Sequence, residues 1–504
     1  MYQFRAGKTL SAIAVALGCG LGFDAATAGA TTVPVNGPNT AIAIMQASAA
    51  MQAEDCTAGI PPLTQLWNDP SVAASDPALA VKLRMQLIVC TFQVEGLTDG
   101  LALSASNIAR PDATADEYDL HIFLQLLAYQ NTAATASLEA ALTKFPSTAG
   151  DLSDTSVLNV LLGLRDSDPD GLHKMLNHLE EVHWQAHDLS HRPMMNLFRI
   201  GSLRKAVAAG DSVHADLYRS DIASDTMVYV VAQGDGNISQ AANPAQDIQP
   251  VVDKEIADLK TWVAANPEDL LSLSILVSLE RADDQDALAL TQLNGILALV
   301  DKYGIEKFDS AEMYGELLTD KGELLADLGR TADARAAYAD GAAKLGDDKN
   351  TNLQLSWMNY LIDSGDEKAA VVLAATIAPA SGDSYLTQAA TLSSDLACAY
   401  GYAGDEPAFG RTVDTLATAP KYRVKPYLCA GDAEGAARNL ISAMGDPDNR
   451  NAMILFMQDG LPPIAFGARD QTYVTALATL KKRPDVLAAA AANHILVRTW
   501  PLRF

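Results

Sequence analysis

Five of the eight histidines lie in one short stretch, DPDGLHKMLNHLEEVHWQAHDLSHRP. An Asp-Pro pair is typical of a helix start, and a later Pro of a helix end, so the stretch predicts one helix over residues 168–193. On that helix Glu180, His183 and His187 follow one another at spacings of three and four residues, which places their side chains on one flank. A carboxylate and two imidazoles at such spacing can bind a transition metal.

Two interpretations of this histidine-rich stretch stay open. One is a metal-binding protein or a metal-dependent enzyme centred on Glu180, His183 and His187. The other, which we favour, is a structural or pH-responsive histidine patch, because the sequence offers no second cluster of metal ligands and the spacing is not HExxH. Under this second interpretation the chain needs no cofactor.

Other motifs with a known chemical role are missing from the sequence. No GxSxG, Walker, GxGxxG or HExxH pattern occurs where a strand would lead into a helix. A muramidase built on a helical superstructure is conceivable, but no appended catalytic domain with a recognisable carboxylate motif is present. The sequence therefore predicts no catalytic residues, and an enzyme is the less favoured class.

The first 30 residues are typical of a secretory signal peptide. Arg5 and Lys8 precede an apolar run and then small residues, which predicts cleavage after Ala28 or Ala30. The run is short for a membrane span, and we expect no transmembrane segment elsewhere. A lipoprotein anchored through Cys19 is the less favoured alternative. We therefore expect a periplasmic or secreted protein.

Composition narrows the class of partner. The 504 residues carry a formal net charge of −26, which argues against nucleic acid and anionic lipid as partners, since both are polyanions. The chain is 49% hydrophobic but only 6% aromatic, as expected for helices that pack closely through small residues. A chain of this length can form one extended core if it is a solenoid of repeats.

The clearest repeat lies between Gly315 and Asp348. Its first half has leucines at helical spacing and then Gly329, which tolerates a left-handed helix end. Its second half follows Thr331, a residue that can cap a helix. Small residues and one aromatic form the stripe of that second helix: Ala334, Ala337, Tyr338, Gly341 and Ala342. The pattern predicts a helical hairpin of about 34 residues that needs neighbours to bury its apolar face.

This unit resembles the tetratricopeptide repeat (TPR) family. The family's small, turn and aromatic positions are matched by Gly322, Gly329, Ala334, Tyr338 and Gly341, whereas Lys321 and Gly346 depart from the pattern. The resemblance implies an all-α fold, an α-solenoid of TPR-like helical hairpins.

Fainter copies of the unit suggest a domain plan. We expect a helical-repeat region over residues 31–232, a loop or hinge over 233–250 that is rich in turn residues, TPR-like repeats over 251–445 and a helical cap over 446–504. The final TWPLRF is apolar and could dock back on the body.

Four cysteines remain if Cys19 leaves with the signal peptide. In an exported chain an even number of cysteines predicts disulfides, and three connectivities are possible. Cys56 with Cys90, and Cys398 with Cys429, each close a loop about as long as one repeat, so we favour that pairing. Buried free thiols are the alternative.

The resemblance also implies a binding surface. In TPR-like proteins the first helices of the repeats line a groove, which in this chain would contain Glu316, Thr319, Glu323, Asp327, Asn352, Asn359 and Asp363. The family's clamp for carboxylates uses cations in that groove, and the sequence shows none at these positions. We therefore expect a neutral or basic protein or peptide as the partner, bound by an exported scaffold of the cell envelope.

Overall fold

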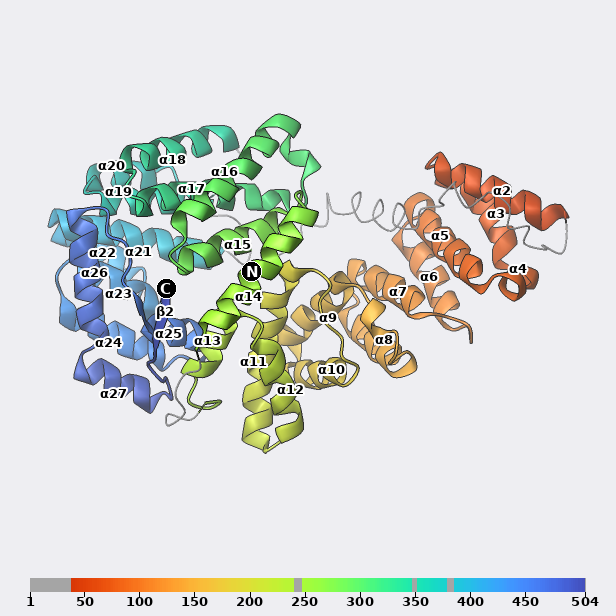
Figure 1. The fold of residues 1–504 in the computed structure, drawn as a ribbon, viewed down its shortest axis with the longest axis horizontal. Helices are drawn as coiled ribbons and strands as arrows, with labels where there is room; N and C mark the ends of the chain where they lie inside the picture. The colour runs from red at the N-terminus through yellow and green to blue at the C-terminus, as the bar shows by residue number, and fades with distance from the viewer. Residues whose placement is uncertain (1–37, 240–246, 347–350, 379–384, 504) are drawn as a thin grey trace. The chain divides into compact units, whose positions relative to one another are not determined.

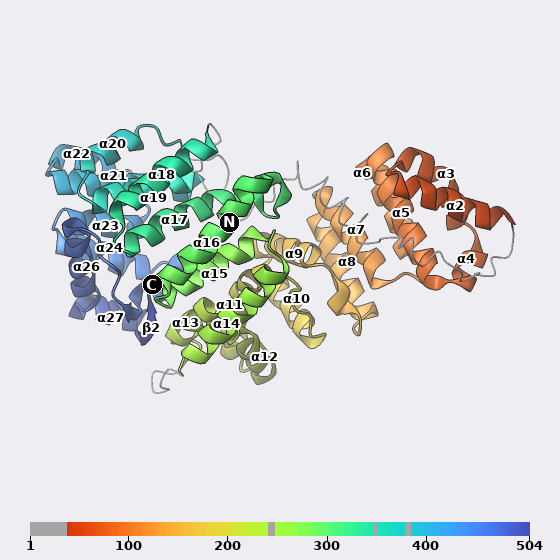
Figure 2. The same cartoon turned by 45° about the horizontal axis from the view of Figure 1, so that its top comes forward.

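The computed structural model describes residues 38–239, 247–346, 351–378 and 385–503 (Figures 1 and 2). The predicted signal peptide and Cys19 lie outside these residues. The described chain is almost entirely α-helical and divides into two compact units, with the boundary between His191 and Arg192. We call residues 38–191 the N-terminal unit and residues 192–503 the C-terminal unit.

The N-terminal unit consists of helices that pack mainly on their neighbours in sequence, α2 on α3, α3 on α5, α5 on α6 and α7 on α8. Aspartates begin several of them, because a carboxylate can accept hydrogen bonds from the free N–H groups of a first turn. The elements are α2 Pro38–Gln52, α3 Cys56–Trp67, α4 Pro70–Ser75, α5 Pro77–Glu95, α6 Leu97–Ile108, α7 Ala115–Leu127, α8 Asn131–Lys144, η1 Ala149–Asp151, α9 Asp154–Ser167, α10 Pro169–Glu181 and η2 Leu189–His191.

Helix α5 is the one described helix that is long and apolar enough to cross a membrane by length and composition. Half of that apolar window is buried inside the structure. The helix also carries Arg84, whose Nε lies 2.7 Å from the carboxylate of Glu117 on α7, with both side chains nearly inaccessible to solvent. We therefore interpret α5 as a core helix of the N-terminal unit.

The C-terminal unit continues the pattern of hairpins and adds a small two-stranded sheet. Its elements are α11 Arg192–Ala209, α12 Ser212–Ile222, α13 Thr226–Gly234, α14 Gln249–Ala265, α15 Leu270–Ala282, α16 Asp286–Tyr303, η3 Ile305–Lys307, η4 Ala311–Met313, α17 Tyr314–Asp327, α18 Thr331–Leu345, α19 Thr351–Asp363, α20 Glu367–Ala374, α21 Tyr385–Ala403, α22 Glu406–Asp414, α23 Pro420–Cys429, α24 Ala433–Met444, η5 Pro447–Asn449, α25 Arg450–Met457, β1 Asp459–Leu461, α26 Ala468–Lys481, α27 Pro484–Ala492 and β2 Thr499–Arg503.

The predicted hairpin over residues 315–348 is present as α17 and α18. Gly329 lies between the two helices at φ 71°, the left-handed conformation expected at a helix end. Gly322 allows close approach, since a Cβ there would lie 2.6 Å from the ring of Tyr338. The prediction of an all-α protein built from TPR-like helical hairpins is confirmed.

The first helices of successive hairpins lie side by side. Helix α15 contacts α17, α17 contacts α19, α19 contacts α21, and α21 contacts α23. Helix α26, from the predicted cap region, packs against α19, α23 and α24. We call the side of α15, α17, α19, α21 and α23 that carries their charged residues the first-helix face.

The end of the chain returns to the start of the C-terminal unit. Helix α25 contacts α13, and strand β2 contacts α15 while pairing in parallel with β1. Figure 1 shows β2 and α25 beside α13. The apolar tail thus docks back on the body, as its sequence suggested.

The predicted hinge over residues 233–250 does not coincide with the boundary between the two compact units. Its first two residues end α13, and Asp235 is fully buried between Arg204 and Arg450. Residues 240–246 lie outside the described residues. The two compact units meet between His191 and Arg192, near the end of the histidine-rich stretch.

The single helix predicted over residues 168–193 is wrong. Helix α10 ends at Glu181, and His183 adopts φ 56°, a left-handed conformation that a continuing helix does not allow. The next residue, Trp184, is fully buried, and its Nε1 donates to the main-chain oxygen of Leu152 at 3.1 Å. Pro193, expected to end a helix, is the second residue of α11.

Candidate functional site

The first-helix face carries a group of charges around Arg281. This side chain extends from α15 to α17, where its Nε lies 2.6 Å from Asp327 and its Nη1 contacts Glu323. Both carboxylates had been expected to line an open groove. They are already paired with a cation of the same unit.

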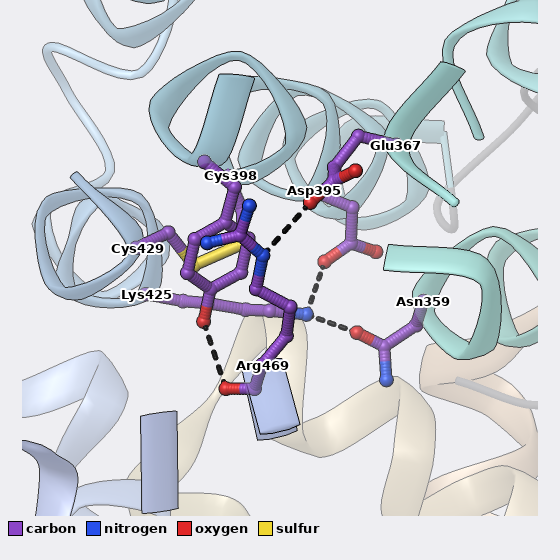
Figure 3. Close-up of a disulfide and its surroundings, with 8 residues drawn as sticks. Asn359, Glu367, Asp395, Cys398, Lys425, Cys429 and Arg469 are labelled. Atoms are coloured by element: carbon purple, nitrogen blue, oxygen red, sulfur yellow. Dashed lines mark hydrogen bonds and ion pairs between the residues drawn. A yellow bond between two sulfur atoms is a disulfide. The ribbon is translucent and has the colours of Figure 1, made fainter. Parts of the chain in front are cut away.

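A second cation, Lys425 of α23, lies on the same face. Its Nζ donates to Asp395 Oδ1 at 2.8 Å and to the side-chain oxygen of Asn359 (Figure 3). Burial alone would lower the pKa of Lys425, but the negative charges of Asp395 and Asp363 outweigh that effect and raise it. Lys425 is therefore a fixed cation that joins α19, α21 and α23.

A disulfide supports this cluster. Cys398 and Cys429 are bonded, with Cα atoms 5.2 Å apart, and lie on α21 and α23 (Figure 3). Asp395 precedes Cys398 by three residues and Lys425 precedes Cys429 by four, so the covalent and ionic links are one helical turn apart. In the N-terminal unit Cys56 and Cys90 are bonded, with Cα atoms 4.9 Å apart. The pairing that the sequence favoured is thus the one in the structure.

The remaining predicted groove residues differ in exposure. Asn352 is exposed and donates its side-chain N–H to Glu316, while Gln388 of α21 donates to Asn352 at 3.1 Å. Thr319 is buried and its hydroxyl donates to the main-chain oxygen of Gly315 at 2.9 Å. The described face is therefore a ladder of polar contacts between neighbouring first helices, with Glu316 and Asn352 at its accessible edge.

Two carboxyl groups of this face, Asp320 and Asp363, have raised pKa values despite the two cations. Burial raises the pKa of Asp320 to about 8, and the nearby carboxylates of Glu323 and Glu316 add to the effect. Among the described residues no partner lies within hydrogen-bonding distance of the buried Asp320 Oδ2. Burial likewise raises the pKa of Asp363 to about 6, despite the opposing charge of Lys425.

The expectation that the groove contains no cations needs correction. It was drawn from the helices that supply the acidic residues, whereas Arg281 and Lys425 come from helices on either side. Each cation contacts carboxylates or amides of a neighbouring first helix. The face consequently has an excess of negative charge, but only part of it is free for a partner.

The proposed metal ligands do not share a helix flank. Glu180 is buried near the end of α10, His183 is exposed just after it, and His187 lies in the following turn. Across the described residues, no group of three His, Cys, Asp or Glu side chains is placed to hold a metal ion. The geometry on which the metal hypothesis rested is therefore not present.

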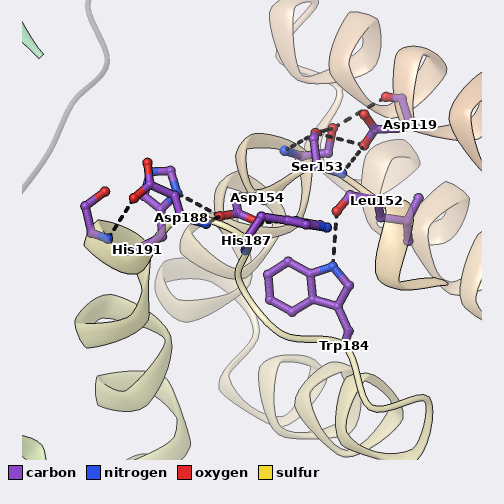
Figure 4. A network of polar contacts seen from close by, with 10 residues as sticks. Asp119, Leu152, Ser153, Asp154, Trp184, His187, Asp188 and His191 are labelled. Carbon is purple, nitrogen blue, oxygen red and sulfur yellow. Dashed lines mark hydrogen bonds and ion pairs between the residues drawn. The ribbon is translucent and has the colours of Figure 1, made fainter. Parts of the chain in front are cut away.

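His187 instead belongs to a network around Asp154, the first residue of α9 (Figure 4). The carboxylate of Asp154 accepts hydrogen bonds from the main-chain N–H groups of His187 and Asp188, each at 2.9 Å. The Nδ1 atoms of His187 and His191 lie 2.9 and 3.0 Å from the same carboxylate. Asp154 thus holds the segment that ends the N-terminal unit.

The pKa of Asp154 reflects this network. Burial alone would raise its pKa, but hydrogen bonds from His191, His187 and Asp188 outweigh that effect and lower it to about 2. The carboxylate is therefore ionised at neutral pH and fully partnered. The contacts with Asp154 give His187 and His191 a structural role at the end of the N-terminal unit.

Sequence reasoning missed four residues that organise these sites: Asp154, Arg281, Asp320 and Lys425. Lys425 had a usable signal, because it lies about one repeat after Asp395, at a separation of 30 residues on an equivalent helix, whereas Arg281 lies 42 and 46 residues from its partners. Asp154 had none, because no pattern in the sequence links it to His187, 33 residues later. Its role depends on tertiary packing.

No family model and no curated protein sequence matches the chain. Three solved structures show a distant likeness. They are the APC/C hetero-tetramer Cut9–Hcn1 (11% identity, TM-score 0.29, 90% of this chain and 96% of that chain), the TPR domain of P58(IPK) (12%, 0.20, 80% and 98%) and Naa15/Naa10 bound to HypK-THB (12%, 0.25, 90% and 70%). TM-scores this low are no evidence of a shared fold. The fold assignment is therefore based on the helical hairpins of the structure itself.

Proposed function

We propose that the protein is an exported α-helical repeat protein that acts as a protein–protein interaction scaffold in the cell envelope. It binds a neutral or basic segment of its partner at the first-helix face. The observation that supports this proposal is Asp320, a carboxyl group with raised pKa and a buried oxygen that lacks a hydrogen-bond partner among the described residues.

A buried carboxyl oxygen without a hydrogen-bond partner is costly to a folded protein, so it is informative where it occurs. A lysine or arginine of a partner that approached Glu316 and Asp320 would lower the pKa of Asp320 and offset the repulsion. Repeat architectures commonly serve as such interaction surfaces. The exposed Asn352, which is hydrogen-bonded to Glu316, gives this edge an accessible position.

A photo-crosslinking amino acid at position 352 tests the proposal in cells that export the protein. Position 340 on α18 is exposed and serves as the matched control. We expect a defined protein adduct from position 352 and none from position 340. The adduct should weaken as salt rises from about 0.05 M to about 0.5 M, because screening reduces charge attraction. Identical adducts from both positions, or none from either, would contradict the proposal.

Once the partner in the adduct is identified, its affinity for variants of the first-helix face can be measured. We expect Asp320→Lys to weaken binding about tenfold, since it replaces an acceptor of positive charge by a repelling cation. Reversal of Glu323 and Asp327 is unsuitable, because it would also break the ion pairs of Arg281. Asp340→Lys on the exposed surface of α18 is the control.

The proposal that the protein is exported is based on the predicted signal peptide. The two disulfides are compatible with an oxidising compartment. Sequencing of the N-terminus of the exported protein tests the proposed export, with cleavage expected after Ala28 or Ala30. Cys19→Ser should leave export and cleavage unchanged. A lipidated N-terminus at Cys19 would show the lipoprotein alternative to be right.

A further inference from the structure

The tail of the chain, residues 495–503, is held by a set of contacts in the C-terminal unit. Its main chain starts at Leu496, whose N–H donates to Gly234 O at 2.8 Å, and continues into β2, which pairs in parallel with β1. Arg498 donates from Nε to Gln233 O at 2.7 Å. The tail therefore lies as an extended segment between the end of α13 and β1.

Trp500 is the first side-chain anchor of the tail. It is 3% exposed, and its Nε1 donates to Gln458 Oε1 at 3.0 Å. Its ring meets that of Tyr229 edge to face, with centroids 6.3 Å apart. Leu502, two residues later, is also fully buried, whereas Thr499 and Pro501 are exposed. Alternate side chains of the tail are thus buried, as expected for an extended strand.

Arg503 is the second anchor. Its Nη1 lies 3.0 and 3.1 Å from the two carboxylate oxygens of Asp286, and its Nη2 contacts Asp284. Nη1 also donates to the main-chain oxygen of Arg281 at 3.4 Å. The side chains of Arg503 and Asp286 are 10% and 6% exposed. Such a buried and multiply bonded guanidinium is a specific contact, because a lysine cannot reproduce the fork.

We propose that the residues holding the tail form a peptide-binding site, which we call the tail cradle: Tyr229, Gln233, Gly234, Asp284, Asp286 and Gln458. Its ligand class is an extended peptide with Trp followed three residues later by Arg. The chain's own tail occupies it in cis. Main-chain pairing with β1 contributes affinity, and the places for Trp and Arg contribute specificity, as in other cases of strand addition.

This inference goes beyond the proposed function and does not depend on it. The tail cradle uses the turn between α15 and α16, α13 and β1, whereas the proposed scaffold surface is the edge formed by Glu316, Asp320 and Asn352. Since a segment supplied in trans needs the same anchors as the tail, the two compete. Weakening the tail in cis should therefore expose the site.

The test uses the full chain and a labelled peptide with the sequence of residues 497–504, VRTWPLRF. Arg503→Glu should release the tail by repulsion from Asp284 and Asp286. We expect the peptide to bind this variant at least tenfold more tightly than the wild type. Adding Asp286→Asn in the same chain should reduce the affinity about tenfold, and a peptide with Ala in place of Trp should not bind detectably.

An Arg503→Glu variant that is folded by circular dichroism and gel filtration, yet binds the peptide no better than the wild type, would overturn the proposal. If that variant does not fold, a protease site can be inserted after the exposed Val497 of the otherwise unchanged chain. After cleavage of the folded protein, the released tail should stay bound and exchange with labelled peptide. Loss of the tail without uptake of the peptide would also overturn the proposal.

A concentration series in sedimentation velocity distinguishes two sources of a trans ligand. A dimer that disappears in Asp286→Asn would identify the tail of a second copy, by exchange of an identical element. A monomer that still binds the peptide as expected would point to a segment of another protein.

Discussion

Two aspartates, Asp154 in the N-terminal unit and Asp320 in the C-terminal unit, show how the same type of side chain takes opposite roles. Asp154 accepts hydrogen bonds from two main-chain N–H groups and lies within 3.0 Å of two histidine rings. Its pKa is lowered to about 2. Asp320 has a buried oxygen without a partner among the described residues, and its pKa is raised to about 8.

The difference indicates which of the two sites is available for binding. A carboxylate that is fully partnered inside the fold stabilises the fold and has no capacity left for a ligand. A carboxyl group that is buried among like charges is held at a free-energy cost, which a partner's cation could reduce. The decisive difference is the number of hydrogen-bond donors around each carboxyl group.

Removal of Asp154 should have the largest effect on stability. We expect Asp154→Ala to destabilise the N-terminal unit by about 3–5 kcal/mol, because it leaves several part-buried donors without an acceptor. Urea unfolding followed by tryptophan fluorescence measures this, since Trp184 is fully buried beside the network. Asp151→Ala, at an exposed site nearby, should change the stability by less than about 0.5 kcal/mol. Equal losses of stability in Asp154→Ala and Asp151→Ala would show that the hydrogen bonds of Asp154 do not stabilise the N-terminal unit.

The pH dependence of the Asp154 effect sharpens the same comparison. The folded-state pKa of about 2 lies below the ordinary value of 3.8, so the stabilisation is fully present above about pH 4 and is lost as the pH falls toward 2. The difference in stability between wild type and Asp154→Ala should therefore become smaller over this acid range.

The two disulfides offer the next test. Replacing Cys398 and Cys429 by Ser should cost about 2–4 kcal/mol, because the bond closes a loop with a sequence separation of 31. The matching change at Cys56 and Cys90, with a separation of 34, should cost a similar amount in the other unit. Thiol counting by mass spectrometry before and after reduction provides the control. No change in stability on reduction would show that the bonds do not form.

Asp320→Asn should have a smaller effect and the opposite sign. Because the carboxyl group is more acidic in the unfolded chain than in the fold, its ionisation lowers stability progressively between about pH 4 and pH 8. We expect the variant to be more stable than wild type at pH 7 by about 1–2 kcal/mol, with a flatter dependence on pH in that range. Destabilisation at pH 7 would mean that the carboxylate is ionised and partnered.

The smallest effect is expected at the accessible edge of the first-helix face. Asn352→Ala removes exposed hydrogen bonds to Glu316 and Gln388 and should change stability by less than about 0.5 kcal/mol. Chemical unfolding measures this. The same variant should still weaken partner binding if this edge is the binding surface, which separates a role in binding from a role in stability.

The helical hairpins and the cysteine pairs could be predicted because their signals are local. Leucine spacing and Gly329 predict the hairpin of α17 and α18 within one stretch of sequence. The pairs Cys56–Cys90 and Cys398–Cys429 follow from loop lengths close to one repeat. Each signal lies within the segment that folds, so distant parts of the chain do not change the outcome.

The histidine-rich helix could not be predicted correctly, because helical spacing continues through residues that the fold uses differently. The pattern around His183 and His187 favours a helix as far as Pro193. In the structure, the hydrogen bonds of Asp154 and the burial of Trp184 hold that stretch as a turn. These partners lie about 30 residues earlier, and sequence spacing gives no indication of them.

The charge balance of the first-helix face was missed for a related reason. The acidic residues of α17 and α19 were visible, but their cations belong to α15 and α23. Lys425 and Asn359 are 66 residues apart in sequence. Only the side-by-side packing of the helices shows that they meet.

The docked tail also bears on cooperativity. In an open array of repeats each unit contacts only its neighbours, so the ends can fray while the middle stays folded. Arg503 and Asp286 are 217 residues apart in sequence, and Arg450 and Asp235 are 215 apart, yet both pairs are in contact. These bonds tie the last part of the C-terminal unit to α13 and α16 in its first part, so neither part can fray independently of the other. The C-terminal unit should therefore unfold in a single sharp transition, and closing it should be the slow, late step of refolding, since the entropy cost of bringing such distant residues together comes before the contacts form.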